Sequence, residues 1–303
     1  MNPTLLLLGL LLAGTFAQCE PAGEDNSSYC RKVILPLVKS PGKDKNLFKT
    51  FKIDGDSQWN PNFWGASLGF DQFTGIGWGT PRAGVLVTPE HTLSAGHYGN
   101  NYKEGVHFYD KNGKFLGSRA VARDANNLTR RTNLPNDIRV ARLESPAPKG
   151  ARIYPLPDPK TDEQRISWCS LPENQRPLLL ATDWRNPVPK KNPADPKEGQ
   201  QWRITRSAHP VLLKRISGGA MGWTYGPRGE PAVHPSYHEI INVGDSSHPL
   251  FWVTKSGLVL ASTFTGTGSG PNYGNPEVQT AIQEAIDKLG GTKQYKIKTA
   301  PVP

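Results

Sequence analysis

Charged residues, cysteines and long apolar runs are all scarce in this sequence. Charged side chains make up only 20% of the 303 residues, yet eight tryptophans, nine tyrosines and ten phenylalanines supply bulky core material, so the composition argues against a wholly disordered chain. Beyond the first residues, no apolar run approaches the length that would cross a bilayer. The 31 glycines and 28 prolines break helices and form turns, which disfavours a helical bundle or coiled coil. The composition therefore predicts an all-β body of short strands.

The beginning of the chain carries a short apolar run, within residues 5–13, followed by small residues. This run is too short to span a bilayer and is typical of a secretory signal peptide. We expect residues 1–17 to be that signal, and the mature protein to be secreted, extracellular or periplasmic, without a membrane span. A lipid anchor on Cys19 is the alternative, but Gln18 argues against it because bacterial lipid attachment requires a small residue before the cysteine.

Only three cysteines are present, Cys19, Cys30 and Cys169. In an oxidising compartment one pair is expected, and because Cys19 and Cys30 both lie near the N-terminus, the sequence predicts a disulfide that ties this region to Cys169. Which of the two is used stays open. Three unpaired thiols, or an intermolecular bridge, are the alternatives.

Changes in composition divide the rest of the chain. Residues 18–58 are rich in Pro, Gly, Lys, Asp and Ser and are expected to form an N-terminal leader partly draped on the body. The body is expected over residues 59–290, as two β-rich halves at about 59–150 and 165–275 that are separated by a Pro-rich connector. Residues 291–303 are expected to form a C-terminal tail.

Apolar residues and turn signals predict the strands within each half. Residues 84–88 and 91–95 are expected to form one hairpin, and residues 106–109 and 115–117 another. One helix is predicted, over residues 277–289, where apolar residues recur at helical spacing before a glycine. Further strands are predicted at residues 138–143, 202–205, 211–213, 250–254 and 258–262.

Three short segments place a histidine, an aspartate and a serine beside apolar strand sequence. They are TLSAGH at residues 92–97, NDIRVARL at 136–143 and GDSSHPL at 244–250. Hydrolysis of an amide by a serine needs a base for the hydroxyl proton, a carboxylate that orients that base, and backbone donors for the developing oxyanion. The segments supply all three kinds of group.

The candidate catalytic residues are His97, Asp137 and Ser246, in that order along the chain. The backbone N–H groups of Gly244 and Ser246 are the candidate oxyanion donors, since Gly244 has no Cβ to keep a substrate oxygen away. Each residue taken alone is more often an ordinary turn or loop residue, so the prediction depends on the three occurring together.

Together these motifs resemble those of trypsin-like serine endopeptidases, which usually read Ala-Ala-His, Asn-Asp-Ile and Gly-Asp-Ser-Gly-Gly-Pro. The motifs follow the family's order at similar intervals, and with the terminal helix the resemblance covers about residues 65–289. It implies two packed six-stranded β-barrels of the chymotrypsin type with a C-terminal helix. It also implies hydrolysis of peptide bonds through an acyl-enzyme intermediate without a cofactor, with His97 taking the proton of Ser246 and Asp137 orienting His97.

The sequence departs from the family pattern in three places. Ser247 and His248 stand where two glycines usually follow the serine, and Tyr98 stands where a cysteine usually follows the histidine. The chain also has no Arg followed by Ile-Val-Gly-Gly, so the new N-terminus that pairs in the family with the aspartate at Asp245 has no counterpart. Asp245 is expected to find another partner. The main alternative function is a catalytically inactive trypsin-like homologue that acts as a basic binding module.

Three residues are candidates for substrate binding by the same resemblance. Ser262 resembles a residue of the family's strand that binds the substrate backbone. Ile240 stands six residues before Ser246, where trypsin has an acid, so cleavage after Lys or Arg is not supported. Phe264 falls where a small residue usually keeps the pocket open, which predicts a shallow apolar pocket for protein or peptide substrates.

The formal net charge of +10 predicts a basic surface that would attract anionic polymers, although a merely solvated surface is the simpler interpretation. The basic residues assigned to it are Arg130, Arg131, Arg139, Arg142, Lys190 and Lys191. We expect a monomer without a metal site. His234, His238 and Glu239 have metal-like spacing but no clear further ligand.

Overall fold

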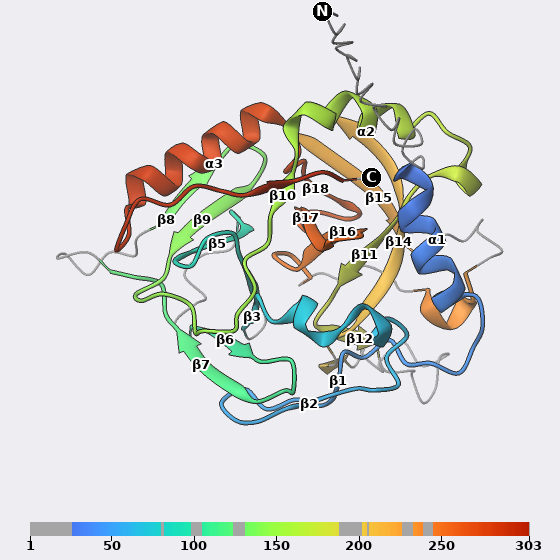
Figure 1. Cartoon of the computed structure of the whole chain (residues 1–303), viewed down its shortest axis with the longest axis horizontal. Coiled ribbons are helices and arrows are strands. Elements are labelled where there is room, and N and C mark those ends of the chain that lie inside the picture. The colour runs from blue at the N-terminus through green and yellow to red at the C-terminus, as the bar shows by residue number, and fades with distance from the viewer. Residues whose placement is uncertain are drawn as a thin grey trace, which may run out of the picture.

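Two large antiparallel sheets form most of the structure, with the helices on their outer sides (Figure 1). It is a computed structural model that describes residues 26–79, 82–97, 105–123, 131–187, 202–204, 206–225, 233–238 and 245–302. The predicted signal peptide at residues 1–17 and Cys19 therefore lie outside the described residues. No helix in these ranges is long and apolar enough to cross a membrane.

The first sheet has seven strands in the order β7-β6-β3-β4-β5-β9-β8. Its two predicted hairpins are confirmed as β4–β5 and β6–β7, and the predicted strand at residues 138–143 is confirmed as β9. The strands are β3 (Ile76–Trp78), β4 (Ala83–Leu86), β5 (His91–Ala95), β6 (Val106–Tyr109), β7 (Phe115–Arg119), β8 (Arg131–Leu134) and β9 (Ile138–Arg142).

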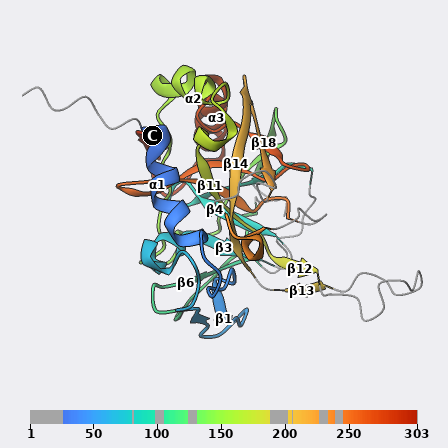
Figure 2. The same cartoon turned by 90° about the vertical axis from the view of Figure 1, so that its right-hand side faces the viewer.

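The second sheet has six strands in the order β17-β16-β11-β14-β15-β18. They are β11 (Leu178–Thr182), β14 (Ala208–Ser217), β15 (Ala220–Tyr225), β16 (Pro249–Thr254), β17 (Gly257–Thr263) and β18 (Ser269–Pro271). Three two-stranded pairs complete the β structure: β1 (Phe48–Thr50) with β2 (Gln58–Trp59), β12 (Arg185–Pro187) with β13 (Trp202–Ile204), and β10 (Leu156–Pro157) with β19 (Thr299–Ala300). Figure 2 shows β12 and β13 projecting from the body.

A mostly β architecture with one large sheet in each half of the chain agrees with the sequence-based expectation. The first sheet has seven strands where six were expected. In each sheet the hydrogen-bonded pairings of the described residues run as an open series from one edge strand to the other, so they establish two curved antiparallel sheets and do not establish two closed barrels.

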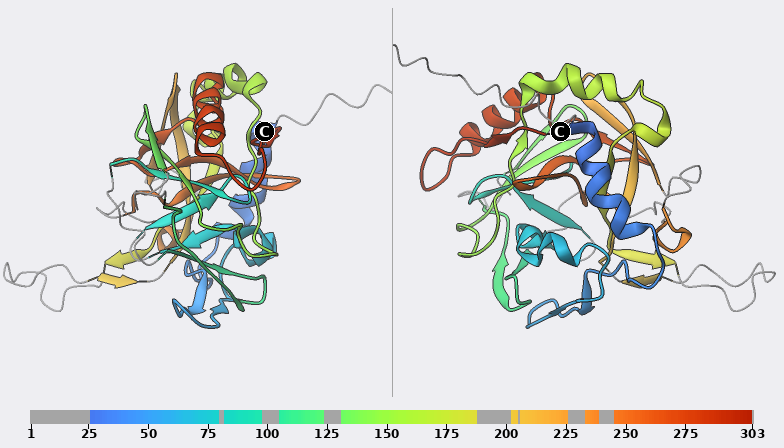
Figure 3. Two further views of the ribbon diagram at one scale, coloured as in Figure 1. Left: turned by 90° about the vertical axis from the view of Figure 1, so that its left-hand side faces the viewer. Right: turned by 45° about the vertical axis from the view of Figure 1, so that its right-hand side comes forward.

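The leader contributes a helix that the sequence analysis did not predict. In α1 (Asn26–Val38), Cys30, Ile34 and Val38 recur four residues apart and are fully buried, where the helix packs on β16 and β11. Pro36 lies inside this helix and hides its pattern in the sequence. A second short helix, α2 (Asp162–Trp168), was also not predicted. Figure 3 shows the helices on the outside of the sheets.

The predicted disulfide between the leader and Cys169 is not formed by Cys30, because Cys30 and Cys169 are both free thiols. The Cys30 thiol points into the core, where it donates to the carbonyl of Val253 at 3.0 Å. Burial raises the pKa of Cys30 to about 12. Cys30 therefore behaves as a small apolar core residue with a satisfied donor.

Beyond α1, the leader also contacts both halves of the chain. The backbone N–H of Leu47 donates to the carbonyl of Arg206, and an isolated bridge pairs Asn46 with Ser207. Phe48 stacks on Trp59 with ring centroids 4.1 Å apart. Residues 44–59 are thus part of the packed body rather than a loose extension.

The predicted terminal helix is confirmed as α3 (Pro276–Leu289), which packs on β8 and β9. The side chain of Asn275 caps its first turn by accepting the N–H of Val278 at 3.1 Å, and Gly290 ends it at φ 68°. The tail then runs back across the molecule, and β19 pairs in parallel with β10. The tail is therefore fixed along much of its length.

Five short 3-10 helices connect these elements in the described ranges. They are η1 (Ala66–Leu68), η2 (Phe70–Phe73), η3 (Pro159–Thr161), η4 (Glu173–Gln175) and η5 (Pro235–Tyr237).

Candidate active site

His97 and Asp137 form a hydrogen-bonded pair just beyond the paired ends of β5 and β9. Ala95 lies opposite Ile138 in that pairing, which sets the two side chains next to each other. The Asp137 carboxylate accepts the backbone N–H of His97 at 2.6 Å, and its other oxygen contacts Nδ1 of the imidazole. An ionised carboxylate can only accept, so Nδ1 is the donor in this contact, and in the neutral imidazole Nε2 then keeps its lone pair. The two side chains are 39% and 32% exposed, which leaves the imidazole accessible from solvent.

A tight turn between β8 and β9 presents Asp137. Asn136 and Asp137 both lie in the left-handed region, at φ 60° and 59°, which asparagine and aspartate tolerate better than most residues. The N–H of Gly96 donates to the carbonyl of Asp137 at 2.8 Å. A Cβ at Gly96 would lie 3.0 Å from a carboxylate oxygen of Asp137, so the close approach favours glycine there.

A buried arginine supports this corner, contrary to the prediction that Arg139 and Arg142 belong to a basic surface. Arg139 is 2% exposed, and its guanidinium donates to the side-chain oxygen of Asn133 at 3.0 Å and to the carbonyl of Gly96. Arg142 is mostly covered and lies 3.6 Å from Glu90. β9 lies between β5 and β8, and every residue from Ile138 to Ala141 is buried, whereas Arg142 at the end of the strand is partly exposed. Of the other basic residues assigned to that surface, Arg130, Lys190 and Lys191 lie outside the described residues.

The loop that carries Ser246 is fastened to the strand that leads to His97. The hydroxyl of Ser247 accepts the backbone N–H of Ala95 at 3.1 Å, two residues before His97. Ser246 itself is half-buried. This bond is one residue from Ser246 and two from His97, and neighbouring Cα atoms are about 3.8 Å apart, so it holds the two segments near each other where the two halves of the chain meet.

The same loop is also held by the second sheet. The N–H of Ser247 donates to the carbonyl of Phe264 at 2.8 Å, and the N–H of Phe264 donates to the carbonyl of His248 at 2.9 Å. The N–H of His248 donates to the carbonyl of Asp245 at 3.1 Å. Ser247 adopts φ 78°, which is unusual for a residue other than glycine. The contacts of Ser247 and Phe264 were not foreseen from the sequence, since nothing in the local pattern indicates them.

Of the three predicted substrate-binding residues, Ser262 and Phe264 lie within the described part of the chain. Ser262 is buried in β17, opposite Leu250, and Phe264 follows the end of that strand. The Phe264 ring is 1% exposed and packs edge-on against Trp223 of β15, with centroids 5.0 Å apart. Phe264 therefore fills space between β15 and the Ser246 loop. Ile240 and Gly244 lie outside the described residues.

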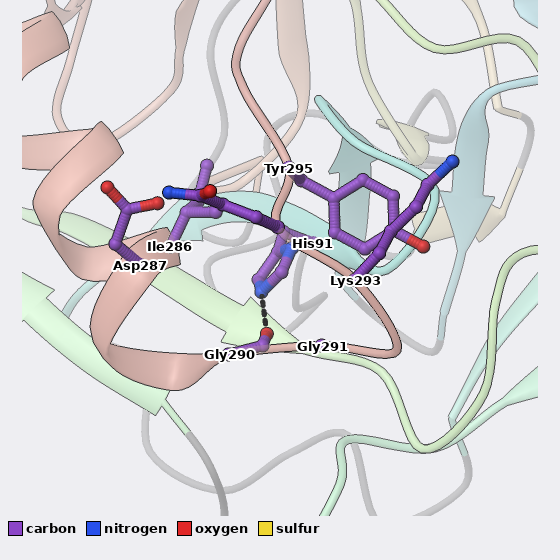
Figure 4. A pocket seen from close by; sticks show the side chains of 8 residues that line it. His91, Ile286, Asp287, Gly290, Gly291, Lys293 and Tyr295 are labelled. Carbon is purple, nitrogen blue, oxygen red and sulfur yellow. Dashed lines mark hydrogen bonds between the residues drawn. The ribbon is translucent and has the colours of Figure 1, made fainter.

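A pocket of about 400 Å³ at the end of α3 lies apart from this site (Figure 4). Its buried histidine, His91, has both ring nitrogens engaged: Nε2 lies 2.8 Å from the carbonyl of Gly290 and Nδ1 lies 2.8 Å from the Thr88 hydroxyl. Burial lowers the pKa of His91. His91 begins β5 and His97 follows its end, so at about 3.3 Å per residue the two are ~20 Å apart. His91 is a structural histidine that anchors the tail.

The structure offers no support for a metal at the histidines considered above. His234 Nδ1 lies 2.8 Å from the Ser236 hydroxyl, and Glu239 lies outside the described residues. Within the described ranges, no group of three or more His, Cys, Asp or Glu side chains is placed to hold a metal ion.

Comparisons with known proteins do not assign the chain to a family. No protein-family model matches it, and no curated protein matches it significantly. The resemblance to trypsin-like endopeptidases therefore depends on the motifs and on the geometry of their residues. Of the three candidate catalytic residues, His97 and Asp137 are joined by hydrogen bonds, and the loop of Ser246 is bonded to the strand end that carries His97.

Proposed function

We propose that the protein is a secreted serine endopeptidase with a chymotrypsin-like architecture of two β-barrels and a Ser246, His97 and Asp137 triad. The observation that carries this proposal is the double contact of Asp137, which accepts both the backbone N–H and the Nδ1 proton of His97. That contact leaves Nε2 as the proton acceptor. The bond between Ser247 and Ala95 supports the proposal further, because it ties the serine loop to the histidine strand.

In the proposed reaction, Ser246 Oγ attacks the carbonyl carbon of the scissile peptide bond while His97 Nε2 takes its proton. Asp137 stabilises the imidazolium that forms. The backbone N–H groups of Gly244 and Ser246 are the proposed donors to the oxyanion. His97 then gives the proton to the leaving amine as the C–N bond breaks. Water hydrolyses the acyl-enzyme by the same steps in reverse, with His97 again as the base.

The proposed substrates are proteins or peptides, bound beside β17. Ser262 is the proposed contact for the substrate backbone, and Ile240 and Phe264 are proposed to shape a shallow apolar pocket. The inward position of Phe264 between β15 and the Ser246 loop supports a pocket of limited depth. Secretion is proposed from the apolar run near residue 1 and its small-residue boundary.

A covalent serine probe tests the proposed function. A fluorophosphonate should label the folded wild-type protein, and Ser246→Ala should abolish labelling, because removal of such a serine costs roughly 10⁶-fold in turnover in subtilisin. Ser236→Ala is the matched control, since Ser236 is an exposed serine of η5 that contacts only His234 in the bonds described above. Absence of labelling in correctly folded wild type refutes the proposal and favours the inactive binding module.

A further inference from the structure

A buried polar cluster lies in the second sheet, next to the Ser246 loop and outside the proposed triad. Asp183, Ser207 and His209 are each 2% exposed or less. The Asp183 carboxylate accepts the Ser207 hydroxyl at 2.6 Å and the Ser207 backbone N–H at 3.3 Å, and its other oxygen lies 3.3 Å from His209 Nδ1. Burying polar groups is costly unless they satisfy one another, and here Asp183 accepts both the hydroxyl and the backbone N–H of Ser207.

The strand register sets this cluster beside His248. β11 pairs antiparallel with β16, and continuing that register past the end of β11 sets Asp183 opposite His248. The hydroxyl of Thr182 donates to the carbonyl of Pro249 at 3.2 Å, so the two strands remain side by side at this point. On its other side Asp183 faces Ser207, to whose carbonyl it donates its backbone N–H at 3.0 Å. Asp183 thus lies between β14 and the residue that follows Ser247.

The electrostatics couple the same groups. Burial by itself would raise the pKa of Asp183, but the contacts with His209 and Ser207 outweigh it, and the pKa falls below its usual value. A positive charge on His248, which the strand register sets opposite Asp183, lowers the pKa of Asp183 further. His248 is 1% exposed, and its ring also lies against Trp78 of the first sheet, with centroids 6.0 Å apart.

We propose that Asp183 and His209 are positioning residues that hold His248, and through it the Ser246 loop, in the conformation in which the serine meets the substrate carbonyl. This inference rests on the proposed function. It explains why Ser247 and His248 can stand where the resembling family has two glycines. The positive φ of Ser247 is offset by its bond to Ala95 on one side of the loop, while His248 lies opposite Asp183 on the other side.

The test measures kcat and KM for hydrolysis of a p-nitrophenyl ester by purified full-length protein. Asp183→Asn and His248→Gln should each lower kcat by roughly 10- to 100-fold, the cost of misplacing a reacting group by about 1 Å, with KM changed less than about twofold. Because the two residues act as one unit, the kcat of the double variant should be no lower than that of the less active single variant. Independent, multiplicative losses would overturn the inference.

Two further variants keep the test decisive. Asp162→Asn is the matched control, since Asp162 pairs with Arg165 at 3.0 Å in α2 and is also buried, and it should leave kcat unchanged even where it lowers stability. If Asp183→Asn does not fold, Ser207→Ala removes only one hydrogen bond to Asp183 and should lower kcat by roughly 3- to 10-fold. An unreactive wild type refutes the proposed function and this inference with it. A reactive wild type whose kcat survives these substitutions refutes this inference alone.

Discussion

The substitution Asp137→Asn separates a catalytic role of the Asp137 and His97 pair from a structural one. Asparagine keeps the size of the side chain, and its one oxygen can still accept the backbone N–H of His97, now 2.6 Å from the carboxylate. Its amide nitrogen then faces Nδ1 and donates a proton. The imidazole must therefore accept at Nδ1 and carry its own proton on Nε2, the atom that has to receive the proton of Ser246.

The expected loss follows from this tautomer change. The corresponding change in a Ser-His-Asp triad lowers kcat by about 10⁴-fold. A factor of that size corresponds to about 5.4 kcal/mol of transition-state stabilisation. The effect on folding should be small, within about 1 kcal/mol, because both side chains are partly exposed and solvent weakens their interaction.

The measurement combines the rate of fluorophosphonate labelling with urea unfolding of the same preparations. Asp54→Asn provides the control, because the Asp54 carboxylate likewise lies 3.0 Å from a histidine Nδ1, that of His107 in β6, and is not part of the proposed triad. The control should label at the wild-type rate. If Asp137→Asn is folded and labels within tenfold of wild type, the assignment of Asp137 as the orienting carboxylate is wrong.

The remaining predictions concern stability and thiol chemistry. Glu90→Gln should destabilise the protein by about 1–3 kcal/mol in urea unfolding, because buried Glu90 accepts bonds from Thr292 and Tyr295 and these fasten the tail. Burial raises the pKa of Glu90, but these bonds outweigh it and bring the pKa below its usual value. The stabilisation by Glu90 is therefore present above that usual value and is lost as the pH falls through the lowered pKa. A stability difference between wild type and Glu90→Gln that persists unchanged at acid pH would contradict this. Cys30 should stay unmodified by a maleimide at pH 8 in the native protein and react only after unfolding, because burial raises its pKa to about 12. Mass spectrometry follows the modification, and rapid reaction of the native protein would contradict the burial of the thiol.

The sequence predicted those strands and helices whose apolar pattern and turn residues lie within one short segment. The hairpins of the first sheet and α3 were predicted because alternation, turn residues and the glycine at 290 all lie within a few residues of one another. The helix α1 was missed because Pro36 and polar residues interrupt its apolar spacing. Arg139 was misplaced on the surface because its burial depends on contacts with Asn133 and Gly96, which form only when β9 pairs with β8 and β5.

In the candidate site, too, local motifs could be predicted from the sequence and contacts between remote segments could not. His97 and Asp137 could be predicted as partners because each lies in a recognisable motif, and the structure joins them. Asp183 could not be predicted, since its contacts with Ser207 and His209 and its place opposite His248 depend on the register of three strands that are remote in sequence. The disulfide prediction was wrong for Cys30 for a related reason: a pairing rule based on compartment does not reveal that the thiol faces the core.

The returning C-terminal segment bears on how the chain acquires its structure during synthesis. Thr292 is bonded to Glu90 and Thr299 pairs with Leu156, so both contacts join the last residues to parts made much earlier. A growing chain lacks these partners until residues 292–299 have been made. Both halves would therefore leave the ribosome before the segment that closes over them, and a truncated product would expose the buried carboxylate of Glu90 without its donors.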